Sequence, residues 1–385
     1  MKKILILTPF TFTRRDYRRF GLDILKRNFF VKILDFSPWF YPNYHKEFIN
    51  EIFTGEEYIS IKKENDFLSL NLINEKFIIF DLLDTNKKSY WVRNKLKNKN
   101  SIFLTFNLNP IPKAEIPKYT LIKKYINFLP QPKVFFMSLF NLFLNKFYNN
   151  KTTYVPDISV VAGLEPLANL KSKKKLYAHS MDYDIYLKIK EKETSTNKVP
   201  PYAVFIDQDF ISHPDMKIFN YDRPVSENKY YPALINFFKN FKIKTGLDIK
   251  FAVHPKSRNK KLKELLKEID YSFGNTEELI KNSSLVLLHS STAISFAVLF
   301  KKPIIILTSD ELKKSWLWPR IKVLSKYTDT KPINIDKDLE SQLNLENIFN
   351  FDKEKYSKYL NQYLKVPDSP DIPLWEIVGN YLKSY

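Results

Sequence analysis

Short apolar runs of strand length alternate with helical patterns along most of this chain, and this alternation constrains the fold most. The runs in the first half are Ile4–Leu7, Phe30–Leu34, Phe77–Phe80, Ile102–Phe106 and Ile158–Ala162. Those in the second half are Val204–Ile206, Ile249–Val253, Leu285–Leu288 and Ile304–Leu307, the last strand that we expect. Because parallel strands need a crossover helix between them, the alternation predicts a mostly parallel, doubly wound α/β sheet.

Helical periodicity places amphipathic helices between several of these runs. One helix is expected from residue 16 to about residue 28, and its apolar face consists of Tyr17, Phe20, Ile24 and Leu25. Another, with Pro232 in its first turn, should end at Gly246. Two helices near residues 356–364 and 375–382 should pack back across the preceding domains.

The length of 385 residues predicts two domains of ordinary size. The stretch 188–198 has no apolar periodicity and Pro200 and Pro201 follow it, so the domain boundary is predicted there. The expected organisation is a Rossmann-like N-terminal domain at 1–190, a Rossmann-like C-terminal domain at 200–330 and a helical tail at 331–385.

The absence of certain residues and motifs excludes several chemistries. Zero cysteines exclude disulfides, thiolate metal sites and cysteine nucleophiles. Only six glycines occur, without a glycine-rich phosphate loop, which disfavours a dinucleotide cofactor and P-loop chemistry. The start of the chain reads as a strand rather than as a signal peptide, so we expect a cytoplasmic protein.

The net charge of +20 has two explanations, a composition that is rich in lysine throughout and an anionic partner. Nucleic acid is disfavoured, because the lysines are spread along the whole chain and no nucleic-acid-binding motif occurs. An anionic glycan, or the inner face of the cytoplasmic membrane, attracts the same charge. The segment Phe135–Phe147 is too short to span a bilayer, so it is either a buried helix or a peripheral membrane contact. Four arginines near the first predicted helix either face an anionic acceptor or form a solvated surface: Arg14, Arg15, Arg18 and Arg19.

Polar residues end two apolar runs of the second half. His254 and Pro255 follow one run, and the side chains of His254, Lys256 and Arg258 suit a phosphate. His289 follows the other run, and the start of a helix comes next with Ser290, Ser291 and Thr292. One hydroxyl is enough for an N-cap, whereas three hydroxyls and the His289 imidazole beside free N–H groups suit an anion. Because the carboxyl ends of parallel strands share one edge, both segments predict a single nucleotide pocket.

Carboxylates follow the run Val204–Ile206. Asp207, Asp209 and Asp215 suit acid, base or nucleophile chemistry on a sugar. A solvated acidic loop and a divalent metal site are the alternatives, and we expect no metal. Glu165 in the first half either faces the same cleft or only favours the start of a helix by its charge.

Two segments resemble motifs of bacterial transferases that use CMP-activated ulosonic sugars, including sialyltransferases and the β-Kdo transferases of capsule and lipopolysaccharide. FAVHP at 251–255 is similar to their histidine–proline motif, and LLHSSTAISFAVLFKKPIII at 287–306 to their serine/threonine motif. The resemblance covers about residues 202–307. It implies a GT-B fold, in which two Rossmann-like domains face a cleft, the N-terminal domain binds the acceptor and the C-terminal domain binds the CMP-sugar.

The resemblance also implies roles for individual residues. CMP contacts are expected for His254 and Pro255 and for Ser290, Ser291 and Thr292, with a CMP-sugar as donor substrate and no further cofactor. Sialyltransferases have a glycine after their acidic pair, whereas Phe210 follows Asp209 here, which favours Kdo as the sugar over a sialic acid. Some Kdo-type enzymes retain the anomeric configuration through an aspartate nucleophile, which matches Asp215 ahead of Asp207, with Glu165 as acid/base.

The implied acceptor is a surface polysaccharide or lipopolysaccharide, free or linked to a lipid. Two other classes stay open. The cytidine-dependent glycerophosphotransferases of teichoic-acid synthesis also have a histidine–proline pair and a serine pair, but theirs usually follows Asp-Tyr, whereas Leu288-His289 precedes it here. A basic binding protein without enzymatic activity is the other alternative.

Overall fold

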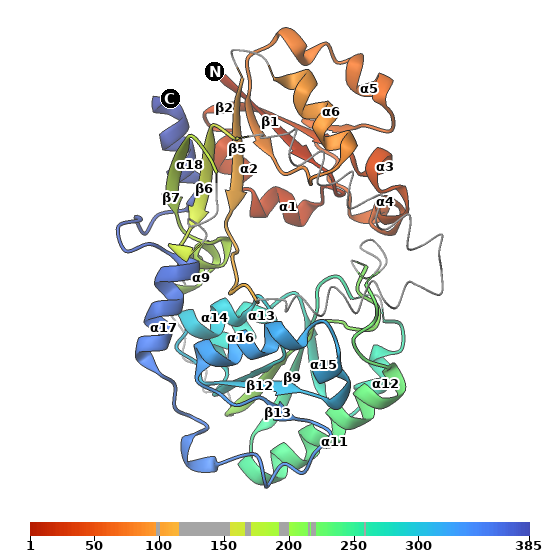
Figure 1. Ribbon diagram of the computed structural model, residues 1–385, viewed down its shortest axis with the longest axis vertical. Helices are drawn as coiled ribbons and strands as arrows, with labels where there is room; N and C mark the ends of the chain where they lie inside the picture. Colours follow the sequence, from red (N-terminus) through yellow and green to blue (C-terminus); the bar gives the residue numbers. More distant parts are fainter. Residues whose placement is uncertain are drawn as a thin grey trace.

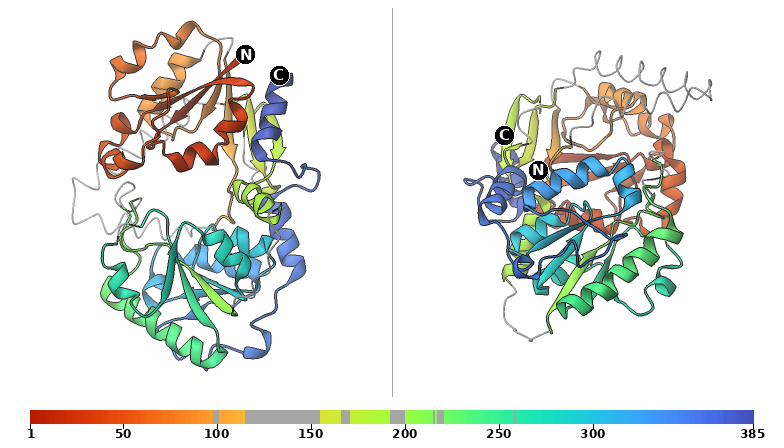
Figure 2. Two further views of the ribbon diagram at one scale, coloured as in Figure 1. Left: turned by 180° about the vertical axis from the view of Figure 1, so that it is seen from behind. Right: turned by 60° about the horizontal axis from the view of Figure 1, so that its bottom comes forward.

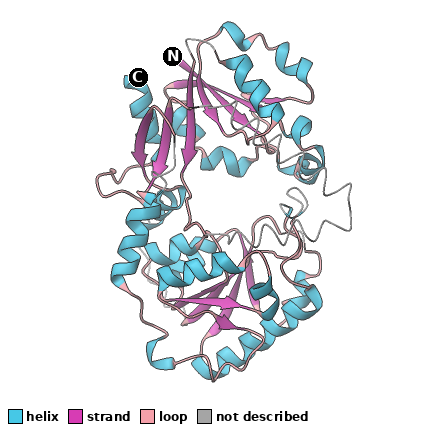
Figure 3. Ribbon diagram, in the orientation of Figure 1, coloured by secondary structure: helices cyan, strands magenta, loops and turns pink. Residues whose placement is uncertain are grey.

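The computed structural model describes residues 1–97, 101–114, 155–165, 171–191, 200–214, 216, 221–257 and 259–385. It contains two Rossmann-like domains, one beyond the other along the long axis of the molecule (Figure 1). Helices flank a sheet in each domain (Figure 3). The first sheet has the order β3-β2-β1-β4-β5-β6-β7 and the second β10-β9-β8-β11-β12-β13. Neighbouring strands are parallel throughout both sheets, which confirms the predicted fold class.

The first domain is built from the first half of the chain. Its strands are β1 (Lys2–Thr8), β2 (Phe29–Asp35), β3 (Tyr58–Ser60), β4 (Ile78–Asp81), β5 (Ile102–Asn107), β6 (Ile158–Ala162) and β7 (Lys174–Ala178). Its described α-helices are α1 (Arg14–Arg19), α2 (Leu22–Leu25), α3 (Ser37–Phe40), α4 (Pro42–Glu47), α5 (Glu64–Leu68) and α6 (Lys87–Leu96). Helix α9 (Met181–Glu191) follows β7 and packs mainly on the core of the second domain.

The second domain follows from residue 200. Its strands are β8 (Tyr202–Ile206), β9 (Asp248–Val253), β10 (Asp270–Phe273), β11 (Leu285–Leu288), β12 (Ile304–Thr308) and β13 (Ile333–Asn334). Its described helices are α11 (Glu227–Thr245), α12 (Leu262–Leu265), α13 (Thr276–Asn282), α14 (Ile294–Leu299), α15 (Asp310–Lys314) and α16 (Trp318–Thr328). The chain ends with α17 (Lys353–Tyr359), the π-helical turn η5 (Leu360–Leu364) and α18 (Leu374–Ser384).

All nine predicted strands are present, and they are the interior strands of the two sheets. Interior strands such as β6, β8 and β11 are buried along their whole length, as expected for a parallel sheet covered on both faces. Among the described residues, the strands that the apolar pattern missed are the four edge strands, β3, β7, β10 and β13. Three of them are partly exposed and β13 is two residues long, so none carries a continuous apolar run. The expectation that Ile304–Leu307 is the last strand was therefore wrong.

Two predicted helices begin or end elsewhere than expected. The helix predicted from residue 16 is divided into α1 and α2, because Gly21 takes a left-handed φ of +52° directly beneath Trp375. Helix α11 begins at Glu227, so Pro232 lies inside it rather than in its first turn. Its end at Gly246, which has a left-handed φ of +72°, is as predicted.

The C-terminal helices pack across both domains, as predicted. Helix α17 contacts α16, and η5 contacts α14, in the second domain. Helix α18 returns to the first domain, where it packs against α2 and β7. Both chain ends therefore lie on the first domain (Figures 1 and 2).

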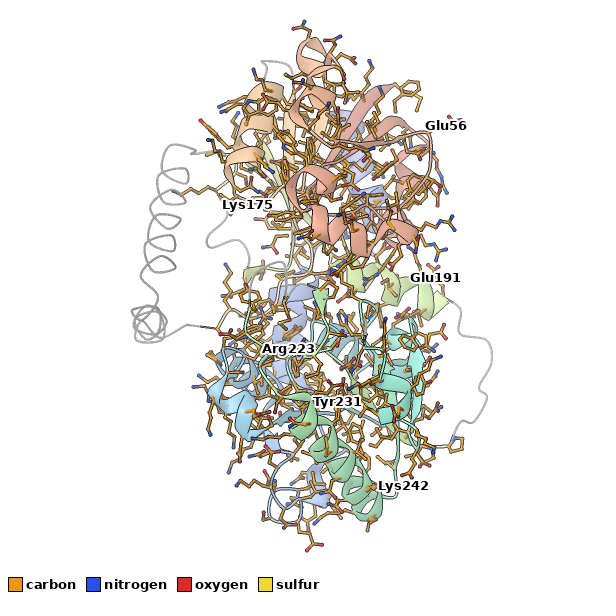
Figure 4. The ribbon with its side chains drawn as sticks, turned by 90° about the vertical axis from the view of Figure 1, so that its right-hand side faces the viewer. Glu56, Lys175, Glu191, Arg223, Tyr231 and Lys242 are labelled. Atoms are coloured by element: carbon orange, nitrogen blue, oxygen red, sulfur yellow. The ribbon has the colours of Figure 1, made fainter. Side chains whose placement is uncertain are left out.

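The segment between the domains is helical for part of its length. Helix α9 continues to Glu191, so the first residues of the stretch 188–198 are helical, and residues 192–199 lie outside the described residues. Glu191 lies where the two domains meet (Figure 4). The aromatic segment Phe135–Phe147 also lies outside the described residues. Among those that are described, no helix is long and apolar enough to cross a membrane.

Candidate functional site

The candidate site lies at the carboxyl edge of the second sheet. In the strand order β10-β9-β8-β11-β12-β13, the chain adds β9 and β10 on one side of β8 and then adds β11, β12 and β13 on its other side. The topological switch point of this sheet therefore lies between β8 and β11. Ligands of open α/β sheets bind outside the carboxyl ends of the strands at such a switch point. Asp207 follows β8, His254 follows β9 and Ser290 lies just beyond β11, so the predicted polar segments meet at this point.

A glutamine joins the two strands at the switch point. The Ser290 N–H donates to Gln208 Oε1 at 2.7 Å, and Gln208 Nε2 donates to Ser290 Oγ at 3.2 Å. Both contacts bridge the loops after β8 and β11. Gln208 was not among the residues singled out from the sequence, and only its position between two aspartates marked it. It holds Ser290, whose side chain is buried, and so fixes the serine/threonine turn.

Asp207 connects β8 to the histidine–proline turn. Its buried carboxylate accepts from the N–H of Asp209 at 2.9 Å and from the N–H of His254 at 3.2 Å. Burial raises the pKa of Asp207 to about 6. Asp209 is also engaged, because its carboxylate accepts from the N–H and the hydroxyl of Ser212. These contacts give both carboxylates a positioning function, and a catalytic role for Asp207 stays a prediction.

The His254 imidazole is a neutral donor. Its Nδ1 accepts from the Lys256 N–H at 3.2 Å, so the proton of the neutral ring is on Nε2. Burial, with His213 and Lys256 nearby, lowers the pKa of His254 to about 3. Pro255 is exposed at the tip of the turn, which the Ser257 N–H closes on the His254 carbonyl at 2.9 Å. The ring therefore offers one N–H to a ligand at neutral pH.

The serine/threonine turn offers backbone donors. Within the described part of the chain, the N–H groups of Ser291 and Thr292 have no hydrogen-bond partner. The Ser291 hydroxyl accepts from the Ala293 N–H at 3.2 Å, and Thr292 is exposed. Successive free N–H groups form a concave site that suits an oxyanion. The turn before α14 is thus compatible with the predicted phosphate contact.

His289 belongs to the core and not to the site. Its Nε2 lies 2.9 Å from the Tyr230 hydroxyl and its Nδ1 lies 2.9 Å from the Leu307 carbonyl oxygen. The ring is fully buried, and this burial lowers its pKa to about 4. The interpretation of His289 as support for the anion site was therefore wrong, because both ring nitrogens are already satisfied beneath the sheet edge.

The lowered pKa values of His254 and His289 predict that both rings stay neutral at mildly acidic pH. Since their folded-state pKa values lie below the ordinary value of about 6.5, the unfolded chain takes up protons first as the pH falls. Their contribution to stability is then complete above about pH 6.5 and is lost on acidification toward their folded-state values. We expect the His254 and His289 rings to stay neutral at pH 5.5 in NMR spectra of the folded protein, with the His254 signal assigned through His254→Ala. Protonation of either ring near pH 6.5 would contradict the hydrogen bonds described above.

The remaining predicted residues are distributed as follows. Asp215 and Arg258 lie outside the described residues. Glu165 is exposed after β6, and its charge acts on the Tyr363 hydroxyl of η5. Among the described residues, no contact joins Glu165 to Asp207 or to His254. Its acid/base role stays a prediction.

The first domain faces this site, and side chains of the two domains meet beside it. The Lys256 ammonium lies 5.8 Å from the centre of the Tyr44 ring, which packs on Phe10 just after β1. Arg15 on one side and Thr292 on the other are both exposed. A cavity of about 340 Å³ opens beside this contact, lined by residues from both domains: Phe40, Tyr41, Pro42, Asn43, Tyr44, Glu47 and Pro214.

A larger cavity, of about 750 Å³, lies at the opposite edge of the second sheet, at the starts of β8, β9 and β10. Its rim charges pair with one another, as in the Lys242–Asp248 contact at 2.5 Å and the Lys250–Asp270 contact at 3.3 Å. Such a rim leaves little net charge to recognise an anion. The switch-point edge is therefore the better candidate site.

Comparisons with known proteins agree on the architecture. The sequence matches no protein-family model and no curated protein. Among solved structures, the wall teichoic acid polymerase TagF superposes with a TM-score of 0.54 at 12% identity, covering 100% of this chain and 88% of that one. The glycotransferase of kitacinnamycin (0.52, 10%, covering 100% and 98%) and S. aureus MnaA with UDP (0.52, 13%, covering 100% and 97%) are similar to the same extent. The chain has a GT-B fold. In this GT-B fold the switch point of the second domain opens on the interdomain cleft.

Proposed function

We propose that this protein is a glycosyltransferase that moves an ulosonic sugar, Kdo ahead of a sialic acid, from a CMP donor to a glycan acceptor. The observation that carries the proposal is the pairing of the neutral His254 donor with the free N–H groups of Ser291 and Thr292 at the switch point. A phosphate there receives hydrogen bonds from both sides. The sequence resemblance supplies the cytidine and the acidic sugar, and the acceptor is a surface polysaccharide or lipopolysaccharide.

The fold supports transfer between a nucleotide donor and a second substrate. One neighbour was solved with UDP, and another is a glycotransferase. The teichoic acid polymerase shares the fold at 12% identity, which does not select its chemistry for this chain. An assay with CMP-Kdo, CMP-sialic acid and CDP-glycerol as parallel donors distinguishes the sugar transferase from the glycerophosphotransferase.

His254→Ala should weaken CMP binding about tenfold or more, because a hydrogen bond to a charged phosphate contributes roughly 1.5–3 kcal/mol. Calorimetry with CMP measures the change. His45→Ala is the matched control, since it removes an imidazole from the first domain that is bonded to Ser37 and Thr11. CMP that fails to bind the wild type, or binds the His254 variant equally well, would overturn the pocket.

For the chemical step we propose a carboxylate nucleophile, with Asp215 ahead of Asp207. The loop after β8 supports this order, because Asp207 and Asp209 already hold backbone and hydroxyl groups. The carboxylate oxygen forms a bond to the anomeric carbon while the bond to the phosphate oxygen breaks and its electron pair leaves with CMP. The acceptor hydroxyl then displaces the aspartate and gives its proton to a base, so the configuration is retained.

Intact-protein mass spectrometry with CMP-sugar and a blocked acceptor tests this step. We expect an adduct of one sugar that is absent from Asp215→Ala. Asp222→Ala is the matched control, because Asp222 is an exposed aspartate of the same loop, and it should keep the adduct. Inverted product without an adduct, or full activity in Asp215→Ala, would reject the nucleophile.

A further inference from the structure

Three aromatic side chains of the first domain line the interdomain cavity of about 340 Å³: Phe40, Tyr41 and Tyr44. They come from α3, from α4 and from the residue between these helices, on the side of the first domain that faces the second (Figure 1). Tyr41 stacks on Phe10 with ring centres 5.4 Å apart, and Tyr44 meets Phe10 edge-on at 5.3 Å. The Tyr41 hydroxyl also donates to the Asp84 carboxylate. Contacts within the first domain therefore fix two of the three rings.

The cavity adjoins the nucleotide pocket at two places. The ammonium of Lys256, in the turn that carries His254, lies 5.8 Å from the centre of the Tyr44 ring. Pro214 lines the cavity from the second domain, and the ring of its neighbour His213 lies 4.6 Å from the His254 ring. A molecule in the cavity therefore lies beside a phosphate that is held by His254.

Besides the tyrosines, the described lining has two polar side chains, Asn43 and Glu47, and both are exposed to solvent. Within the described part of the chain, the Asn43 amide has no hydrogen-bond partner, so it offers a donor and an acceptor. The Glu47 carboxylate offers acceptors. A cavity of a few hundred Å³ with aromatic walls and a few polar groups is typical of a site for a small molecule.

This lining suits an uncharged sugar ring. The C–H groups on one face of a hexose are its apolar part, and they pack on aromatic rings, whose faces carry partial negative charge. The hydroxyls around the ring match Asn43 and Glu47. The described lining contains one carboxylate and no cation, because Lys256 lies outside it, in the turn that receives the phosphate. The carboxylate of an acidic sugar would be repelled by Glu47.

We propose that this cavity binds the terminal sugar of the acceptor and that this sugar is uncharged, although the chain as a whole has a net charge of +20. The inference rests on the proposed function, which puts the donor phosphate at His254, and it adds the substrate class of the acceptor. Tyr41 and Tyr44 then hold the apolar face of the sugar. Asn43 and Glu47 orient its hydroxyls toward the donor.

Saturation-transfer NMR with methyl glycosides tests the inference. The neutral probes are the methyl glycosides of glucose, galactose, mannose and N-acetylglucosamine, and the acidic probes are methyl glucuronide and methyl galacturonide. Glucoside and glucuronide differ only at C6, as do galactoside and galacturonide. We expect a neutral glycoside to bind about fivefold or more tighter than its acid. Glu47→Gln removes the repulsion and should reduce this difference to less than about twofold.

Asn43→Trp should abolish binding of the neutral glycosides, because the indole fills the cavity. The affinity for CMP, measured by calorimetry, should change less than about twofold, since the phosphate contacts stay intact. Asn43 is exposed, so the larger side chain does not disturb the core. Asn50→Trp is the matched control, because Asn50 is an exposed asparagine just after α4 and outside the described lining. It should behave as the wild type.

Each other result has a distinct meaning. If no neutral glycoside binds, or if the acids bind as well as their neutral counterparts, the inference is wrong, while CMP binding would leave the proposed function intact. Unchanged glycoside binding in Asn43→Trp would place the sugar elsewhere and reject the cavity. A wild type that binds no CMP would reject the proposed function and the acceptor role of the cavity together.

Discussion

Trp375→Ala should destabilise the first domain by about 3–5 kcal/mol, the usual cost of truncating a large buried aromatic side chain. Trp375 is 1% exposed although it comes from the last helix of the chain. Its ring centre lies 5.5 Å from that of Phe20 and 5.9 Å from that of Phe80, and its Nε1 donates to the Arg19 carbonyl at 2.7 Å. Its loss opens a cavity in the core and frees the end of α1.

Chemical denaturation followed by circular dichroism measures this effect. Trp316→Ala is the matched control, because Trp316 is 40% exposed and stacks on Tyr221 at the surface of the second domain. It should change stability by about 1 kcal/mol or less. Similar losses in both variants would contradict the placement of α18 in the core of the first domain.

Gly163→Ala should lower the free energy of unfolding by about 3 kcal/mol or more, because it adds backbone strain and a steric clash. Gly163 follows β6 with a left-handed φ of +76°, and an added Cβ would lie 2.2 Å from the carbonyl oxygen of Gln362 in η5. The neighbouring Leu164 N–H donates to the Asn361 carbonyl at 3.0 Å. A side chain at residue 163 thus pushes apart the backbone contact between the first domain and the segment that returns from the second.

Gly274→Ala isolates the strain from the clash. Gly274 has the same φ of +76°, but an added Cβ meets nothing within 4 Å. The free energy of unfolding of this variant should fall only by the cost of an alanine with a left-handed backbone, about 1–2 kcal/mol. If thermal or chemical unfolding shows equal losses at both positions, the close packing of η5 on β6 is wrong.

The sequence alone determined the interior of both sheets and the place of the candidate site. Strands such as β6 and β11 are buried on both faces, so their residues are apolar without interruption and can be recognised locally. The buried, apolar part of each strand ends where polar residues begin, so the polar residues directly after β9 and β11 marked the carboxyl edge of the sheet. Chain order then placed both segments near one switch point, because βαβ connections are right-handed and parallel.

Only the tertiary structure decided what each polar side chain does. His254 and His289 follow strands in the same way, but one ring opens to the cleft and the other is enclosed by Tyr230 and Leu307. The edge strand β13 and the contact of Gly163 with Gln362 depend on segments far apart in sequence. Such contacts leave no periodic pattern, because periodicity reports the face that a residue buries and not the partner that it meets.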